Sequence, residues 1–387
     1  MAAGWRGLAL PLNFAVMTSA LELFNLSDFV LFETVTLVSA AIASVYSKTK
    51  GPFVLASWKF RYQHEVLMCG VVFLVFAAAT AFLYFFRSDS FSLNCLLYFL
   101  TTTFVHVNLS ILSYKDRLHH RLVAAAFFGF AAKPLFTFLT LGILLFLSEK
   151  GANAAFLLLT LTNVFLIFIG ACRSLFTKSE RAFFENQNSP NFGSLARSAL
   201  IATGAKNLDI FVLQAMGAQS TIAAGFLIVR RSVGIVDAAL DFVRFTHEAE
   251  IAKTGRVAST VNFQVMMFAG GAGVAATLFC FWCLKTYTVL TTSYILVLTS
   301  AVVLAAVSCG YSGLAMSQLT YTGNQLVRER ALILGMLLAL LAVPLAFFSQ
   351  ILALLTLIIS RFFPRILART YIDKMERFKN HRRREGQ

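Results

Sequence analysis

Long unbroken apolar stretches constrain this chain more than any other feature. The segment Val66–Phe86 (VLMCGVVFLVFAAATAFLYFF) contains no charged side chain. At about 1.5 Å per residue, a helix of this length crosses the roughly 30 Å hydrocarbon core of a bilayer. Only helices and closed barrels satisfy their backbone hydrogen bonds in lipid, and barrel strands alternate apolar and polar residues. This segment does not alternate, so the pattern predicts membrane-spanning helices.

The composition extends this conclusion to the whole chain. Hydrophobic residues make up 58% of the 387 residues and charged residues only 13%, whereas a soluble domain carries about a quarter charged residues. Too few polar groups are present to cover a water-exposed surface. This excludes a soluble enzyme, a disordered regulator and a disulfide-stapled secreted domain. We predict an all-α polytopic membrane protein.

The six cysteines lie within or at the edges of the apolar stretches. Cys280 and Cys283 form a CxxC motif, but its neighbourhood, LFCFWCL, offers no further metal ligand. We interpret the cysteines as small apolar residues in helix packing and expect no metal site, no cofactor and no enzymatic activity.

Twelve apolar segments are predicted as transmembrane helices. The run from Leu8 to Tyr46 is too long for one crossing, and the turn formers Asn25 and Asp28 in its middle favour two helices joined by a tight hairpin. The predicted spans are Leu8–Phe24, Phe29–Tyr46, Val66–Phe86, Phe91–Ser113, Leu122–Leu147, Ala154–Phe176, Ala199–Gly217, Thr221–Arg244, Val261–Cys283, Val289–Gln318, Ala331–Phe347 and Gln350–Ala368.

Basic residues set the predicted orientation. With a cytoplasmic amino terminus, nearly all basic residues outside the spans fall on the cytoplasmic side, and we assign Arg361, Arg365 and the basic residues after them to that side. The opposite side receives Arg87, Lys150 and Lys285. We therefore predict a multi-pass protein of the cell inner membrane with both termini cytoplasmic. The net charge of +15 reflects topology and requires no nucleic-acid partner, and the terminal KNHRRR suits anionic membrane lipids.

The chain divides in the middle. Residues 177–198 are polar and contain Pro190 and Gly193, which is typical of a linker. This predicts an N-terminal six-helix bundle (1–176), a cytoplasmic linker (177–198), a C-terminal six-helix bundle (199–368) and a basic cytoplasmic tail (369–387). Each half opens with two helices around a short outer turn, so we predict two pseudo-symmetric bundles.

Three segments carry a resemblance to a known family: LFNLSDFVLFETVTLVSA in the first hairpin, Thr203–Val236 at the start of the second half, and Tyr321–Phe348 near the end. In these segments the chain resembles the Wzx-like polysaccharide flippases, which flip O-antigen or capsule repeat units, of the multidrug/oligosaccharidyl-lipid/polysaccharide exporter superfamily. The resemblance implies alternating access of two bundles around a central cavity. It also implies an oligosaccharide on a polyprenyl diphosphate as substrate, and contact with other polysaccharide assembly proteins.

Charged residues inside the spans are the candidate site residues, because a charge at mid-bilayer costs roughly 2.5–3.5 kcal/mol even on insertion scales. We predict that Lys133, Lys206, Arg230 and Arg231 bind substrate, since a diphosphate needs cations and Arg offers a two-pronged fork for its oxygens. The alternative is that they pair with carboxylates and meet no ligand. His106 is expected to be a hydrogen-bonded core residue.

The embedded carboxylates Glu33, Asp209 and Asp237 are candidates for proton coupling, and coupling to H⁺ or Na⁺ stays open. Asp209 lies three residues after Lys206, on the same helical face. These two residues form either a self-neutralising pair or part of a cavity-facing site.

Three other functions stay open. A polysaccharide polymerase would show a long outer loop, which the predicted topology lacks. A cation-coupled small-molecule or drug exporter of the same superfamily would favour a net acidic cavity, whereas the embedded charges here have both signs. A major-facilitator transporter would show a basic, glycine-containing turn after its second helix, and Ser47–Arg61 matches that pattern loosely.

Overall fold

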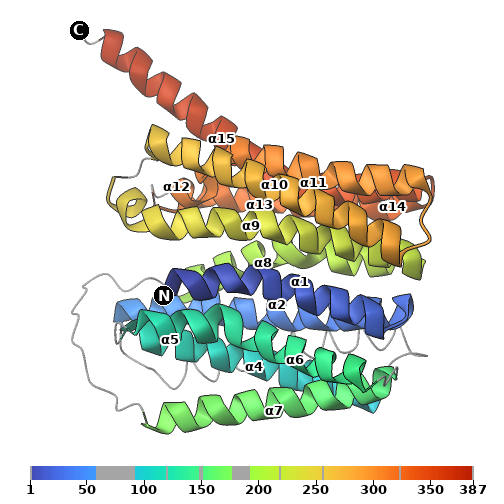
Figure 1. Ribbon diagram of the computed structural model, residues 1–387. Helices are drawn as coiled ribbons and strands as arrows, with labels where there is room; N and C mark the ends of the chain where they lie inside the picture. Colours follow the sequence, from blue (N-terminus) through green and yellow to red (C-terminus); the bar gives the residue numbers. More distant parts are fainter. Residues whose placement is uncertain are drawn as a thin grey trace. The chain divides into compact units, whose positions relative to one another are not determined.

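The computed structural model describes residues 2–57, 92–118, 121–147, 151–176, 192–217, 219–254, 257–321 and 324–385. All regular secondary structure in these ranges is helical (Figure 1). The predicted all-α class is therefore confirmed. The predicted span Val66–Phe86 lies outside the described residues.

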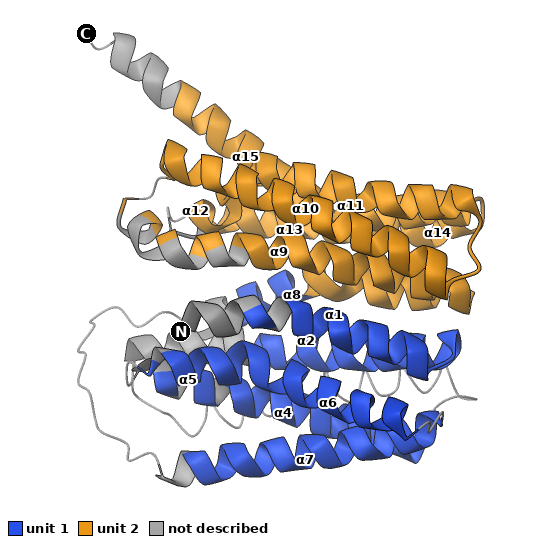
Figure 2. Cartoon of the chain, viewed as in Figure 1, with its two compact units in different colours: residues 1–203 blue, residues 204–387 orange. Residues whose placement is uncertain are grey.

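The chain forms two compact units, Met1–Thr203 and Gly204–Gln387 (Figure 2). The helices before the middle of the chain are α1 (Ala2–Leu23), α2 (Leu26–Ser57), α4 (Leu93–Leu118), α5 (Leu122–Ala126), the π-helix η1 (Phe127–Ala131), α6 (Ala132–Phe146) and α7 (Ala152–Phe176). Those after it are α8 (Phe192–Ala215), α9 (Ser220–Thr254), α10 (Ser259–Tyr287), α11 (Thr292–Ser312), α12 (Ala315–Tyr321), α13 (Gln325–Leu340), α14 (Ala342–Ala346) and α15 (Gln350–Glu385). Every other predicted span coincides with helix in these lists.

Three details differ from the predicted segments. The span Val289–Gln318 is divided between α11 and α12 by Gly313, whose φ of 53° lies in the left-handed region that glycine adopts without strain. The helix α8 already begins at Phe192, inside the segment predicted as linker, and α15 continues to Glu385, through most of the predicted tail.

Seven helical segments of the described residues are long and apolar enough to cross a membrane. They are Leu26–Tyr46, Val123–Phe146, Ala152–Arg173, Ser259–Tyr287, Thr292–Ser312, Gln325–Ala346 and Gln350–Arg377. These segments make the chain a multi-pass membrane protein. The number of twelve spans remains a prediction.

The tight hairpin between the first two helices is confirmed. The backbone N–H of Asp28 donates to Asn25 Oδ1 at 2.9 Å, and the Asn25 side-chain amide donates to Asp28 Oδ2 at 2.8 Å. Asn25 therefore satisfies a backbone donor at the start of α2, as residues of this type do at helix N-termini.

Three helix pairings occur at corresponding positions in the two units. In unit 1, α2 packs on α4, α4 on α7 and α6 on α7; in unit 2, α9 packs on α11, α11 on α15 and α13 on α15. Counted along each predicted half, these are the second helix with the fourth, the fourth with the sixth, and the fifth with the sixth. This correspondence supports an internal repeat.

The helix α10 shows how a helix separates an inward face from a lipid face. Its buried positions follow helical spacing and are mostly small, and Cys280 and Cys283 are free thiols among them. A methyl group built on Gly273 would lie 2.4 Å from Ala306 Cβ of α11. Large side chains such as Phe263 and Leu278 are exposed, which suits contact with acyl chains.

Candidate functional site

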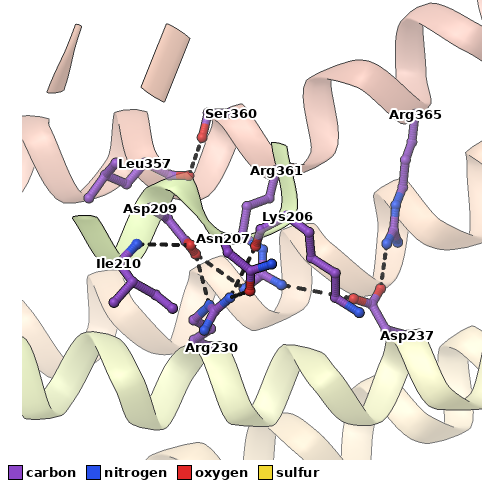
Figure 3. A network of polar contacts seen from close by, with 10 residues as sticks. All are labelled: Lys206, Asn207, Asp209, Ile210, Arg230, Asp237, Leu357, Ser360, Arg361 and Arg365. Carbon is purple, nitrogen blue, oxygen red and sulfur yellow. Dashed lines mark hydrogen bonds and ion pairs between the residues drawn. The ribbon is translucent and has the colours of Figure 1, made fainter. Parts of the chain in front are cut away.

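A network of charged side chains lies among α8, α9 and α15 of unit 2 (Figure 3). Its charged members are Lys206, Asp209, Arg230, Asp237, Arg361 and Arg365. Most other residues that these helices bury are apolar, so each buried charge needs a partner.

Asp209 and Arg230 form the centre of the network. Arg230 Nε donates to Asp209 Oδ2 at 3.0 Å, and the two side chains are only 4% and 2% exposed. Arg230 Nη2 also donates to the Lys206 carbonyl oxygen at 3.0 Å and to Asn207 Oδ1 at 2.8 Å. The other carboxylate oxygen, Asp209 Oδ1, accepts the backbone N–H of Ile210 at 3.0 Å. Arg230 is thus fixed to α8 by three hydrogen bonds.

Two further arginines come from α15. Arg361 reaches Asp209 Oδ2 at 3.6 Å and Asp237 Oδ2 at 4.0 Å, so it stands between the two carboxylates. Arg365 pairs with Asp237 Oδ1 at 2.7 Å and donates from Nη1 to Cys309 Sγ at 2.7 Å. The last long helix is therefore joined to α9 and α8 by ion pairs.

Lys206 is exposed, and its amino group points toward the Asp237 carboxylate (Figure 3). Arg231 is half-buried, one position along α9 from Arg230. The network proper therefore contains four cations and two carboxylates, a formal excess of two positive charges.

The centre of the network lies at mid-span. Arg230 follows the start of α9 by ten residues and Arg361 follows the start of α15 by eleven, and both helices begin at the same end of the unit (Figure 1). At about 1.5 Å per residue, both arginines lie about 15 Å from that end. This is about half the thickness of a hydrocarbon core of roughly 30 Å.

The structure brings four predicted site residues together: Lys206, Asp209, Arg230 and Asp237. Asp209 pairs with Arg230 and Arg361, and the short-range pair with Lys206 on the same helix does not form. The pairing of Arg230 with a carboxylate is the alternative that the sequence left open.

Sequence reasoning missed Asn207, Arg361 and Arg365. Arg361 and Arg365 were assigned to the cytoplasmic side, which stays a prediction; in the structure Arg361 lies near Asp209 of α8, and Arg365 pairs with Asp237 of α9. Their position inside the predicted span Gln350–Ala368 was the available signal.

Lys133 and Glu33 belong to unit 1. Lys133 is the second residue after η1 and is buried, with Nζ 2.6 Å from His106 Nε2 of α4. This contact shows His106 to be hydrogen-bonded, as expected, at a half-buried position. Glu33 of α2 is fully buried. The π-turn before Lys133 is a feature often found at functional sites.

Comparisons with known proteins extend the picture of the fold. No protein-family model matches the sequence, and no curated protein matches it. Among solved structures, a crystal structure of MATE in complex with MaL6 aligns with a TM-score of 0.51 at 14% sequence identity. The alignment covers 97% of this chain and 93% of that chain. The likeness shows that this chain has a MATE-like fold with two halves.

Proposed function

We propose that this protein is a transporter that flips an oligosaccharide linked to a polyprenyl diphosphate across the cell inner membrane, by alternating access, in surface polysaccharide biosynthesis. The observation that carries the proposal is the excess of positive charge in the mid-span network of α8, α9 and α15. A diphosphate in the same layer of the membrane supplies the missing negative charge.

The chemistry of the cations suits this substrate. A charged group in lipid is costly unless it is paired or faces water, and a diphosphate is one of the most strongly charged headgroups to cross a membrane. Arginine offers planar, two-pronged donation to phosphate oxygens, and three of the four cations in the network are arginines. The resemblance to Wzx-like flippases supports the same substrate.

Reconstituted vesicles provide the test. The purified full chain is placed in liposomes with a fluorescent, short-chain polyprenyl diphosphate sugar, and dithionite quenching reports which leaflet holds the label. Faster exchange between leaflets than in protein-free liposomes is expected. Exchange at the protein-free rate, with protein shown to be inserted, would reject the proposal.

A second candidate is a small-molecule or drug exporter, and the MATE-like fold favours it. The charge balance argues against a cationic substrate, because the network already carries more cations than carboxylates. Efflux of a cationic dye by the same liposomes, without flipping of the lipid, would support this alternative.

Coupling to H⁺ or Na⁺ is a further part of the proposal. Asp209 and Asp237 are both ion-paired, so an incoming proton has to displace a guanidinium. Glu33 is a fully buried carboxylate of α2. We propose Glu33 as the first carboxylate to examine. If Glu33 couples transport to protons, the rate of lipid flipping by the Glu33→Gln variant is expected not to respond to an imposed pH gradient.

A further inference from the structure

Among the buried arginines of the network, Arg361 makes the longest contacts. Its side chain is only 11% exposed, yet its ion pairs to Asp209 and Asp237, at 3.6 and 4.0 Å, are longer than hydrogen bonds. No hydrogen bond to this guanidinium is present within the described part of the chain. The mostly buried side chain thus has N–H donors available for a further acceptor.

Arg230 also has donors to spare, although it is fixed in place. Its Nε and Nη2 are used in three hydrogen bonds, whereas Nη1 is buried and has no hydrogen-bond partner among the described residues. A buried donor without an acceptor costs about 1–3 kcal/mol. The unused edge of Arg230 is therefore a second position in the network that lacks an acceptor.

The two guanidinium groups lie close together, because both reach the same atom. Asp209 Oδ2 is 3.0 Å from Arg230 Nε and 3.6 Å from Arg361 Nη1. One carboxylate oxygen thus serves two cations. A ligand with several anionic oxygens supplies the acceptors that both lack.

We propose that Arg361 and the Nη1 edge of Arg230 form a binding subsite for a phosphate-class anion. In this subsite Arg361 leaves its long contacts to the two carboxylates and binds the anion, while Arg230 stays fixed to α8 and presents Nη1. The subsite deepens the proposed function and rests on it for one point only, that the anion is the diphosphate of a lipid carrier. A free phosphate or pyrophosphate presents the same chemistry.

The rest of the network tolerates the departure of Arg361. Asp209 keeps Arg230 at 3.0 Å and Asp237 keeps Arg365 at 2.7 Å, so neither carboxylate is left without a cation. Arg361 also lies three residues before Pro364, which cannot donate to the Ser360 carbonyl, so α15 lacks one helical hydrogen bond beside it. Both features lower the cost of moving this side chain.

The test compares anion binding by variants of one helix. Inorganic pyrophosphate and a short polyprenyl diphosphate are titrated by calorimetry into the purified full chain in detergent. Arg361→Gln is expected to weaken binding of the bound anion by about ten- to a hundredfold, and Arg361→Lys less, because it keeps the charge and loses the fork. Arg369→Gln is the matched control, since Arg369 lies on α15 and pairs only with Asp373 at 3.0 Å in the described structure. It should bind as the wild type does.

The outcomes separate the subsite from the proposed function. Binding of pyrophosphate that depends on Arg361, without flipping of the lipid in liposomes, supports the subsite and rejects the lipid substrate. Binding of the lipid diphosphate alone, weakened by Arg361→Gln, supports both. The subsite is overturned if wild type and Arg361→Gln bind the anion equally well and a thermal unfolding midpoint shows both to be folded. It is also overturned if the wild-type protein binds neither anion. Should Arg361→Gln fail to fold, Arg361→Lys decides in the same way.

Discussion

Arg230 of α9 and Asp209 of α8 form an almost fully buried ion pair, with Nε 3.0 Å from Oδ2. The pair joins two helices that are consecutive in the chain. The same oxygen, Asp209 Oδ2, also lies 3.6 Å from Arg361 Nη1 of α15. Removing one partner of such a pair exposes the other to an apolar environment without compensation. The stability of the unit and its charge balance therefore depend on the same few atoms.

Asp209→Asn tests this dependence. The substitution leaves Arg230 and Arg361 without their shared carboxylate, and we expect a loss of about 3–5 kcal/mol, the usual cost of breaking a buried pair. Thermal unfolding in detergent measures it. Asp373→Asn is the control, because Asp373 and Arg369 form a partly exposed (i, i+4) pair on α15 that contributes about 0.3–0.5 kcal/mol. Similar unfolding midpoints for both variants would contradict the central role of Asp209.

Asn207→Asp tests the excess of positive charge. Asn207 Oδ1 accepts a hydrogen bond from Arg230 Nη2 at 2.8 Å, so a carboxylate of the same shape fits this position and lowers the excess by one charge. We expect unchanged or raised thermal stability together with pyrophosphate binding weakened by about tenfold. Asn324→Asp, at the start of α13, carries the same change of charge outside the network and should bind normally. Equal binding by both variants would show that the charge balance does not matter.

Gly335→Ala tests the packing of α13 on α15. A Cβ on Gly335 would lie 2.5 Å from Pro364 Cγ and 2.9 Å from the Ser360 carbonyl oxygen, so the two helices have to move apart. We expect a cost of about 1–3 kcal/mol in the thermal unfolding of the purified protein. Gly270→Ala on α10 meets nothing within 4 Å, and should gain a few tenths of a kcal/mol to about 1 from helix propensity. A neutral Gly335→Ala would mean that α13 and α15 are not packed this closely.

Variants at His106 test the buried contact of unit 1. Lys133 Nζ lies 2.6 Å from His106 Nε2. His106→Gln keeps an acceptor for the ammonium group, and His106→Leu does not. We expect His106→Leu to lower stability by about 1.5–3 kcal/mol and His106→Gln by less, measured by thermal unfolding. When Lys133 is also replaced by Met, the difference in stability between the two His106 variants should shrink, because the donor is gone. An undiminished difference would show that the contact between Lys133 and His106 is not its cause.

Reporter fusions test the orientation. The distribution of basic residues predicts that both ends of the chain are cytoplasmic. A fluorescent protein fused after Gln387 should therefore fluoresce, and alkaline phosphatase at the same position should be inactive. An active phosphatase fusion would reverse the predicted topology and, with it, the predicted direction of transport.

Much of the fold was predictable from the sequence because it depends on local composition. The length of each apolar run determines whether a helix can cross the membrane, and Asn25 and Asp28 mark the first hairpin through hydrogen bonds within four residues. The high cost of charge in lipid also singled out Lys206, Asp209, Arg230 and Asp237 as candidate site residues, since this cost depends on the residue and its position in a span.

The partners of these charges were decided by the tertiary structure alone. The spacing of Lys206 and Asp209 favours an ion pair on one helix face. In the structure the Asp209 carboxylate instead accepts a hydrogen bond from Arg230 of the next helix, whose donor group is longer and forked. Arg361 and Arg365 resemble basic residues that mark a cytoplasmic helix end. They lie inside the predicted span Gln350–Ala368, but nothing local shows which carboxylates they contact. Their role depends on which helix lies beside α15, and that contact joins residues more than a hundred positions apart. Composition and periodicity carry information about single helices, whereas an ion pair between helices is set by their packing.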